Sequence, residues 1–409
     1  MNTQWFQIES VDEKEKIGKA AGILRRGGLL AVPTETVYGL AGNGMSEAAV
    51  EKIYEVKGRP AIKPLALMVH DPSAMKKYCE DVPPQALSLA KRFWPGPLSI
   101  VLKAKQSVPE IVRAGGKTVS LRCPDHPLTL ELIKRAGLPL AAPSANPSGK
   151  ESPKNAESVL NYFDGKIAAV IDGGECGIGT ESTIIDMSAA PYKILRRGAL
   201  SEESIAQALS DELTVFGITG GTGCGKTPVL GELKKLGAYV IDCDELYHEM
   251  LNYDEALLSD INRCFPGTVN DGVLDRKHLG AYVFSNAEAL EDLNAITHRH
   301  IQAEVDKRLR TCAMRGVRLA AIDAIALIES GLSDRCKTVI GVTADTTVRM
   351  NRIMKRDGID AQYAMMRINA QQPNAYFEQH CDHIIKNDGT EAELIEKFRN
   401  LYKEVIKNG

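Results

Sequence analysis

The sequence lacks the features that mark membrane, secreted and disulfide-rich proteins. No apolar run approaches the roughly 20 residues that a membrane-spanning helix needs. The first residues, 1–5, have neither the basic nor the apolar segment of a secretory signal. The nine cysteines are scattered, and no two of them have the C-x-x-C spacing. We therefore expect a cytoplasmic protein with no membrane partner and no disulfide-linked partner.

A strong excess of one charge is also missing. Residues 1–208 carry 26 Lys and Arg against 23 Asp and Glu, and residues 209–409 carry 24 against 30. Neither half is basic enough to predict nucleic-acid binding from its overall charge. The 409 residues are enough for two or three globular domains, and the pattern of elements favours two of α/β type, at 1–208 and 213–409.

A glycine-rich loop lies just past the midpoint of the chain. Residues 220–227 read GGTGCGKT and match G-x-x-x-x-G-K-[ST], the phosphate-binding loop (P-loop) of many nucleotide-binding proteins. A buried strand is predicted before it, at 213–218, and a helix after it, at 228–235. Glycines let backbone N–H groups turn toward phosphate oxygens, while Lys226 supplies positive charge and the Thr227 hydroxyl suits Mg²⁺. The predicted ATP site consists of Gly221, Thr222, Gly223, Cys224, Gly225, Lys226 and Thr227.

Two carboxylates follow the next predicted parallel strand, at 238–241. The carboxyl end of a strand in an open α/β sheet faces the ligand crevice. We predict that Asp242, on a strand next to the P-loop strand, accepts a proton from a substrate hydroxyl. Asp244 is expected to cap the following helix or to contact Mg²⁺ through water.

The rest of the second half is predicted to be helical over 254–312, with buried strands at 319–322 and 338–342. Arginines then recur on predicted helices, among them Arg352 and Arg356. Spaced arginines late in a P-loop kinase suit a mobile lid over the phosphates. A solvated helix face is the alternative.

The first half contains strands and helices without regular βαβ spacing, which predicts a mixed α/β domain. Helices are expected before Gly27 and between Ser46 and Gly58. Strands are expected at 29–32, 66–70, 98–102, 119–122, 168–172, 182–187 and 192–195.

Cationic, hydroxyl and amide side chains gather at the ends of these elements, which suggests a site for a polyanion. At these positions the first half, from about residue 8 to 205, resembles the YrdC-type threonylcarbamoyl-AMP synthases. The matching motifs, in the family's order, are 33–40, Lys57-x-Arg59, 94–98, Ser144-x-Asn146, Ser182-Thr183 and Arg196-x-Gly198.

This resemblance implies synthesis of threonylcarbamoyl-adenylate from L-threonine, bicarbonate and ATP, with release of pyrophosphate. The product serves the threonylcarbamoyladenosine modification of tRNA, so tRNA-modification proteins are the implied downstream partners. Lys57 and Arg59 would be catalytic because they offset charge on the phosphates. ATP would be bound by Lys57, Arg59, Ser144, Asn146, Ser182 and Arg196. L-threonine would be bound by Thr34, Tyr38 and Arg122, whose fork matches a carboxylate.

The second half, from about residue 213 to 405, resembles dephospho-CoA kinase. The resemblance rests on the P-loop and on four later motifs: 240–244, Leu293-x-x-Ile296-x-His298, Arg356-Asp357-Gly358 and Arg367-Ile368-x-x-Gln371. It implies a parallel sheet, a helical substrate region, a lid, and transfer of phosphate from MgATP to the ribose 3′-hydroxyl of dephospho-CoA. Asp242 and Lys226 would be catalytic, Thr227 would bind Mg²⁺, and Arg352, Arg356 and His298 would contact the substrates.

Three positions depart from the kinase pattern. Pro228 directly follows Thr227, and Arg299 follows His298 where the family has Pro. Residues 323–329 read DAIALIE where the family has DIPLLFE, which predicts an altered acceptor pocket.

The sequence thus favours a bifunctional enzyme but leaves two alternatives open. The first half could be an RNA-binding module without synthase activity. The second half could be a degenerate P-loop domain that binds nucleotide without transferring phosphate.

Overall fold

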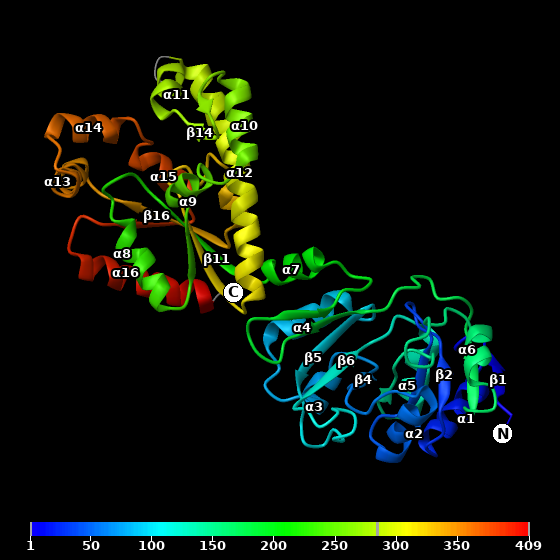
Figure 1. Ribbon diagram of the computed structural model, residues 1–409. Coiled ribbons are helices and arrows are strands. Elements are labelled where there is room, and N and C mark those ends of the chain that lie inside the picture. Colours follow the sequence, from blue (N-terminus) through cyan, green and yellow to red (C-terminus); the bar gives the residue numbers. More distant parts are fainter. Residues whose placement is uncertain (1, 284–285, 408–409) are drawn as a thin grey trace. The chain divides into compact units, whose positions relative to one another are not determined.

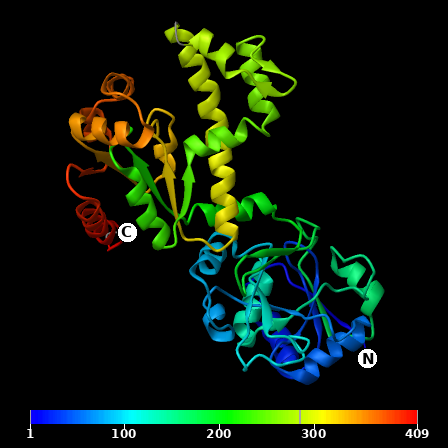
Figure 2. The ribbon, with the colours of Figure 1, turned by 60° about the vertical axis from the view of Figure 1, so that its left-hand side comes forward.

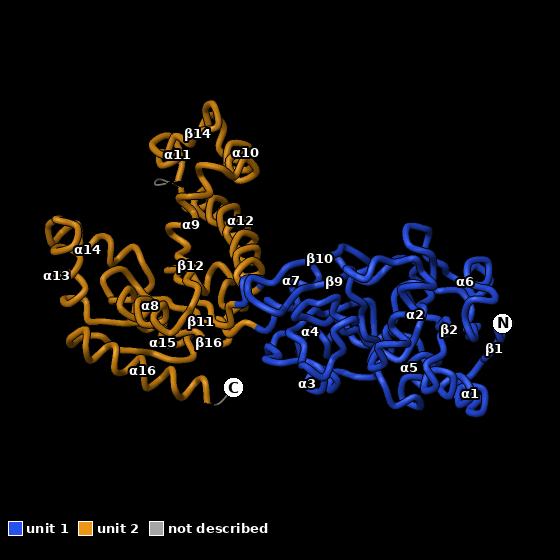
Figure 3. Tube along the Cα trace, turned by 60° about the horizontal axis from the view of Figure 1, so that its bottom comes forward, with its two compact units in different colours: residues 1–212, 314–316 blue, residues 213–313, 317–409 orange. Residues whose placement is uncertain are grey.

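The computed structural model describes residues 2–283 and 286–407. The chain forms two compact units, shown in Figure 3: residues 1–212 with 314–316, and residues 213–313 with 317–409. Among the described residues, none of the helices combines the length and the apolar character that crossing a membrane requires.

The first unit is built on a ten-stranded mixed sheet in the order β1-β8-β2-β3-β7-β4-β6-β5-β9-β10 (Figure 1). Its strands are β1 Gln4–Gln7, β2 Leu30–Val32, β3 Gly39–Asn43, β4 Ala66–Met68, β5 Leu98–Lys103, β6 Thr118–Arg122, β7 Leu140–Ala141, β8 Ala169–Asp172, β9 Thr183–Asp186 and β10 Lys193–Arg196. Its helices are α1 Lys14–Arg25, α2 Glu47–Lys57, α3 Ala74–Tyr78, α4 Pro84–Phe93, α5 Pro127–Ala136, α6 Ala156–Phe163 and α7 Glu202–Ser210.

Local signals in the sequence explain the helices of this unit. The Ser46 side chain accepts the Ala49 N–H as the N-cap of α2, and Gly58 ends that helix in the left-handed region (φ 56°). In α1 the apolar residues recur at helical spacing, and this face packs on α5 and the sheet. The buried residues of that contact include Ile17, Ala20, Ala21, Leu24, Leu128 and Leu132.

The seven strands predicted in this unit are confirmed within two residues at each end. Three strands were missed for physical reasons. Strand β1 is a largely exposed edge strand of sequence QWFQ, β3 contains two glycines, and β7 has only two residues. Neither β1 nor β3 shows the apolar run or the alternation that marks a strand, and two residues are too few for β7 to show a pattern.

The second unit has a five-stranded sheet, all parallel, in the order β12-β15-β11-β16-β17. These strands are β11 Thr214–Thr219, β12 Tyr239–Asp242, β15 Leu319–Asp323, β16 Thr338–Thr343 and β17 His383–Lys386. The helices are α8 Lys226–Lys235, α9 Cys243–Met250, α10 Glu255–Cys264, α11 Arg276–Val283, α12 Ala287–Met314, α13 Thr346–Asp357, α14 Ala361–Asn369, α15 Asn374–His380 and α16 Glu391–Lys407.

Both faces of this sheet are covered by helices, as expected for parallel strands. On β15, Leu319 and Ala321 pack with α8 and α16, whereas Ala320 and Ile322 pack with α9 and α12. Helix α12 runs alongside the sheet and continues beyond it to α10 and α11 (Figures 1 and 2).

Two predictions about the strands and helices of this unit are wrong. Strand β15 lies between β12 and β11, so Asp242 is not on a strand next to the P-loop strand. The helical stretch 254–312 is interrupted by a hairpin of β13 Val269–Asn270 and β14 Val273–Leu274. Asp271 and Gly272 form its turn, both with positive φ, and Asp-Gly is the usual signal for such a turn.

Candidate active sites

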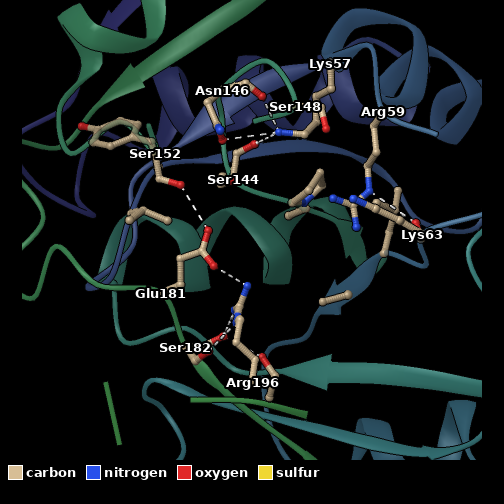
Figure 4. A pocket seen from close by; sticks show the side chains of 18 of the residues that line it. Lys57, Arg59, Lys63, Ser144, Asn146, Ser148, Ser152, Glu181, Ser182 and Arg196 are labelled. Carbon is tan, nitrogen blue, oxygen red and sulfur yellow. Dashed lines mark hydrogen bonds and ion pairs between the residues drawn. The ribbon is translucent and has the colours of Figure 1, made fainter. Parts of the chain in front are cut away.

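A cavity of about 370 Å³ opens in the first unit at the ends of several strands and loops. It gathers every residue predicted for this half except Thr34: Tyr38, Lys57, Arg59, Arg122, Ser144, Asn146, Ser182 and Arg196. Figure 4 shows Lys57, Ser144 and Asn146 on one side of the cavity and Ser182 and Arg196 on the other. Lys63 and Lys150 also line it, so that cations outnumber the single lining carboxylate, Glu181.

Lys57, the last residue of α2, is almost completely buried at one wall. Its Nζ donates to the carbonyl oxygens of Ser144 and Asn146, each at 2.5 Å (Figure 4). Burial, with a smaller contribution from the charge of Arg59, lowers the pKa of Lys57 to about 8. Lys57 therefore fixes the 144–146 loop and places positive charge behind the cavity.

The other walls carry two arginines that are only partly buried. The Arg59 guanidinium donates to the carbonyl oxygens of Lys63 and Pro64 at 3.3 and 3.1 Å. Arg196 pairs with Glu181 at 2.5 Å and donates to the Ser182 hydroxyl at 3.0 Å. Glu181, which directly precedes Ser182, was not predicted to have a role in the site. It holds Arg196 in place and balances part of the positive charge.

Arg122 ends β6 and lies at the bottom of the cavity, only 6% exposed. Its Nη2 donates to Glu35 and to the Thr36 hydroxyl, each at 2.7 Å. Its Nε is buried without a hydrogen-bond partner within the described chain. A buried donor without an acceptor is costly, so this atom is suited to an anionic ligand.

The hydroxyls of Thr34 and Tyr38 are used inside the protein. Thr34 Oγ1 donates to the Val37 carbonyl at 2.7 Å, and Thr34 does not line the cavity. Tyr38 lines it, but its hydroxyl donates to the Gly174 carbonyl at 2.8 Å, and burial raises the pKa of that phenol. Of the three residues predicted to bind threonine, only Arg122 presents an unsatisfied group.

In the second unit the P-loop connects β11 to α8. Gly220, Gly223 and Gly225 have φ values of 137°, 83° and 95°, which side chains disfavour. A Cβ on Gly220 would lie 2.1 Å from the Val342 carbonyl oxygen, and one on Gly225 would lie 2.2 Å from Asn387 Nδ2. The loop shape therefore requires glycine at these positions.

Lys226 begins α8, and its Nζ lies 3.1 Å from the Gly220 carbonyl oxygen and 3.6 Å from Asp323 Oδ1. Asp323 ends β15 and was not predicted as a site residue. Burial raises its pKa to about 6; Lys226 opposes this rise, and Asp242 and Asp244 add to it. The Oδ1 atom of Asp323 is buried without a hydrogen-bond partner in the described part of the chain. Such an oxygen is suited to binding a cation.

Comparisons with known proteins match the two halves of the chain to two different families. A family model described as "Telomere recombination", for the Sua5, YciO and YrdC proteins, matches residues 22–198, and a "Dephospho-CoA kinase" model matches residues 214–393. A dephospho-CoA kinase of Corynebacterium jeikeium is 33% identical over 191 residues, which cover 46% of this chain and 98% of the relative.

The first half matches a threonylcarbamoyl-AMP synthase of Pyrococcus abyssi at 47% identity over 199 residues, 49% of this chain. A crystal structure of P. abyssi Sua5 complexed with L-threonine has a TM-score of 0.50 and 30% identity, and covers 87% of this chain and 98% of that one. In sequence, the chain spans 58% and 60% of the synthases of P. abyssi and Bacillus subtilis. The chain belongs to both families, one in each half.

Within the kinase half, Asp242 occupies the N-cap position of α9. Its Oδ1 accepts the N–H groups of Asp244 and Glu245 at 3.0 and 3.1 Å. The prediction that Asp244 caps this helix is therefore wrong. Asp242 is the last extended residue before the helix (φ −88°, ψ 111°), which is where a cap must lie. It also pairs in register with Asp323, so both carboxylates reach the same edge of the sheet.

The predicted lid and substrate residues separate in the structure. Arg352 Nη1 lies within 3.5 Å of the Gly223 and Cys224 carbonyl oxygens, so it contacts the P-loop. Arg356 instead pairs with its neighbour Asp357 at 2.7 Å and is exposed. The structure thus brings Arg352, and not Arg356, to the phosphate site.

His298 lies on α12 in a cavity of about 240 Å³ beside α9. Burial lowers its pKa, which favours the neutral imidazole, while Glu329 opposes this shift. The altered 323–329 segment reaches this cavity, because Ala324, Ile325 and Ala326 line it together with Asp244 and Tyr247. If the altered 323–329 segment changes the acceptor pocket, the change therefore lies in this cavity.

Magnesium suits the polar groups at the P-loop. It prefers oxygen ligands, needs only one or two from the protein, and keeps several waters. Asp323 Oδ1 and the exposed Thr227 hydroxyl at the start of α8 are such groups. No group of three or more His, Cys, Asp or Glu side chains that could form a closed metal site occurs among residues 2–283 and 286–407.

Proposed function

We propose that the chain is a cytoplasmic bifunctional enzyme with one ATP-dependent reaction in each half. Residues 1–208 convert L-threonine, bicarbonate and ATP to threonylcarbamoyl-AMP and pyrophosphate, for use by tRNA-modification proteins. Residues 213–409 transfer the γ-phosphoryl group of ATP to the 3′-hydroxyl of dephospho-CoA. The observation that carries the proposal is the presence of two separate phosphate-binding arrangements, each in the half whose family uses ATP.

The cation-lined cavity supports the synthase reaction. The threonine amine first forms an N–C bond with bicarbonate and water is lost, which gives N-carboxythreonine. A carbamate oxygen of this species attacks the α-phosphorus of ATP, a new O–P bond forms, and the bond to pyrophosphate breaks. Arg59 and Arg196 offset the charge that builds on the phosphates, and Lys57 adds to the positive potential from behind the wall. Ser144, Asn146 and Ser182 position the nucleotide. Arg122 receives the threonine carboxylate, because its guanidinium fork matches a carboxylate and its Nε has no acceptor among the described residues.

The P-loop site supports the kinase reaction. Backbone N–H groups of the loop that have no acceptor among the described residues, such as those of Gly223 and Gly225, bind the β- and γ-phosphates together with Lys226. Thr227 and Asp323 would hold Mg²⁺, which would supply positive charge next to the phosphate oxygens when bound. Asp242 accepts the proton of the ribose hydroxyl as that oxygen attacks the γ-phosphorus. Arg352 supports the phosphate side, and His298 contacts the acceptor.

Product analysis of the purified chain tests both halves separately. Pyrophosphate release should require threonine and bicarbonate together, and ADP release should require dephospho-CoA. If RNA is bound but no pyrophosphate appears, the first half is an RNA-binding module. If nucleotide binds but no ADP forms with dephospho-CoA, the second half is a degenerate P-loop domain.

A further inference from the structure

Two buried side chains hold the P-loop from outside the nucleotide site. Asn387 follows β17 and is 5% exposed, and its Nδ2 donates to the Cys224 carbonyl oxygen at 2.7 Å. Arg349 lies on α13 and is 3% exposed, and its Nε donates to the Thr222 carbonyl oxygen at 3.0 Å. Both side chains come from segments more than 120 residues further along the chain.

These two hydrogen bonds fix the orientation of two peptide groups. In a trans peptide the C=O and the following N–H point to opposite sides of the chain. With the Cys224 carbonyl turned to Asn387, the Gly225 N–H points away from Asn387. In the same way, the Thr222 carbonyl points to Arg349, so the Gly223 N–H points away from Arg349.

The two N–H groups are left free for a ligand. Among the hydrogen bonds of the described residues, neither the Gly223 nor the Gly225 N–H has an acceptor. Backbone N–H groups that converge without an acceptor form an anion-binding concavity. Preorganised donors of this kind bind phosphate without the cost of reorienting the loop at each turnover.

Asn387 is itself held in one orientation. Its backbone N–H donates to the Thr343 carbonyl at 2.8 Å, and its carbonyl oxygen accepts Arg352 Nη1 at 3.0 Å. Its side-chain Oδ1 faces Arg352 Nη2 at 3.4 Å, which leaves Nδ2 for Cys224. Arg352 thus orients the side-chain amide of Asn387 so that its Nδ2, and not its Oδ1, faces the P-loop.

We infer that Asn387 and Arg349 are positioning residues of the kinase half, which hold the P-loop in its phosphate-binding shape without touching the nucleotide. The inference rests on the proposed kinase function for its catalytic consequence. The other part of the inference, that these residues set the shape of an anion-binding loop, does not depend on phosphate transfer. It requires only that the loop binds nucleotide.

Asn387→Asp tests the inference in the full chain. The variant keeps the size of the side chain and its contact with Arg352, but it loses the Nδ2 donor and sets a carboxylate oxygen against the Cys224 carbonyl. We expect the Kd of MgADP, measured by titration calorimetry, to rise about tenfold, because one buried hydrogen bond is lost and a repulsion replaces it. The KM for MgATP should rise similarly, while the KM for dephospho-CoA stays within about twofold.

Asn374→Ala is the matched control. Asn374 Nδ2 also donates to a backbone carbonyl of this unit, that of Ala344 at 3.0 Å, but not to the loop. The control should leave the Kd of MgADP unchanged even if it lowers Tm. Asn387→Ala, which loses the donor without adding charge, should show an intermediate rise in Kd.

Two outcomes would overturn the inference. One is an unchanged Kd of MgADP in Asn387→Asp with only a lower Tm, which would make Asn387 a purely structural residue. The other is an equal rise in Kd in the Asn374→Ala control. A wild-type chain that binds MgADP but transfers no phosphate to dephospho-CoA would refute the proposed kinase activity instead, and the titrations would still decide the positioning role.

Discussion

At the scale of single residues, Lys57 and Arg59 are two positions apart but have different surroundings. Lys57 is buried and donates to two carbonyl groups, whereas Arg59 lies at the rim and contacts two carbonyl groups of an exposed loop. Both carry positive charge that the proposed synthase reaction would use, so either alanine variant should abolish threonine-dependent pyrophosphate release.

The two variants should differ in stability. Lys57→Ala leaves the Ser144 and Asn146 carbonyls unpaired and should cost about 2–4 kcal/mol, which lowers Tm. Arg59→Ala should leave Tm within about 2 °C, because surface changes have small effects. Thermal unfolding followed by circular dichroism, alongside the pyrophosphate assay, provides the check. Equal loss of stability in both variants would contradict the assigned burial of Lys57.

Asp323 gives a prediction about pH. Its pKa of about 6 in the fold lies above its ordinary value of 3.8, so the folded chain binds more protons than the unfolded chain between these values. Stability therefore falls as pH rises from about 4 to 6 and stays lower above that range. The cost at neutral pH is on the order of 2–3 kcal/mol, since each pKa unit corresponds to about 1.4 kcal/mol.

Asp323→Asn should remove this cost and lower kinase kcat at the same time. The free energy of unfolding of the kinase half, measured by urea denaturation, should rise at pH 7.5 and match the wild type near pH 4, where Asp323 is protonated. A gain of the same size at both pH values would show that the carboxylate charge is not responsible.

At the scale of elements, local sequence signals predicted most strands and several helices, whereas the order of the strands depends on long-range pairing. The Ser46 cap and the Gly58 terminus of α2 are local signals, and both are confirmed. The insertion of β15 between β12 and β11 is a non-local choice, because several apolar strands fit a parallel sheet equally well. This is why Asp323 was missed: its position beside Lys226 depends on sheet order, not on a motif around it.

The same division applies to the candidate sites. The cavity residues around Lys57 and the P-loop residues were found because each belongs to a short motif. Glu181, Arg349 and Asn387 lie outside such motifs or act through neighbours, so their partners were visible only in the structure. The roles assigned to the motif residues stay predictions until variants are measured.

The cap of α9 gives a prediction that separates stability from catalysis. Asp242→Asn keeps a good N-cap, whereas Asp242→Ala loses it and should cost about 1 kcal/mol. Both variants lose the proposed base, so kcat of the kinase should fall by at least about 100-fold in each. Steady-state kinetics and thermal unfolding should therefore give equal kcat values but a lower Tm for the alanine variant. A near-normal kcat in the asparagine variant would move the base role to another carboxylate, with Asp323 the nearest choice.

At the scale of the whole molecule, each unit has its own buried core and its own site residues. Among residues 2–283 and 286–407, those in the core around α1 and α5 all belong to the first unit, and those in the cores on the two faces of the parallel sheet all belong to the second. The described residues that line the cavity around Lys57 likewise all belong to the first unit. Side-chain changes confined to one site should therefore leave the other reaction intact.

Arg59→Ala and Lys226→Ala test this independence in the full chain. Arg59→Ala should abolish threonine-dependent pyrophosphate release and keep dephospho-CoA-dependent ADP release within about twofold of wild type. Lys226→Ala should do the reverse, because it removes the charge that offsets the β- and γ-phosphates of the kinase ATP. Both products should be measured on the same preparations at matched folded fraction. If either substitution lowers both activities by the same factor, the two sites do not act independently, and their energetic coupling becomes measurable from the double variant.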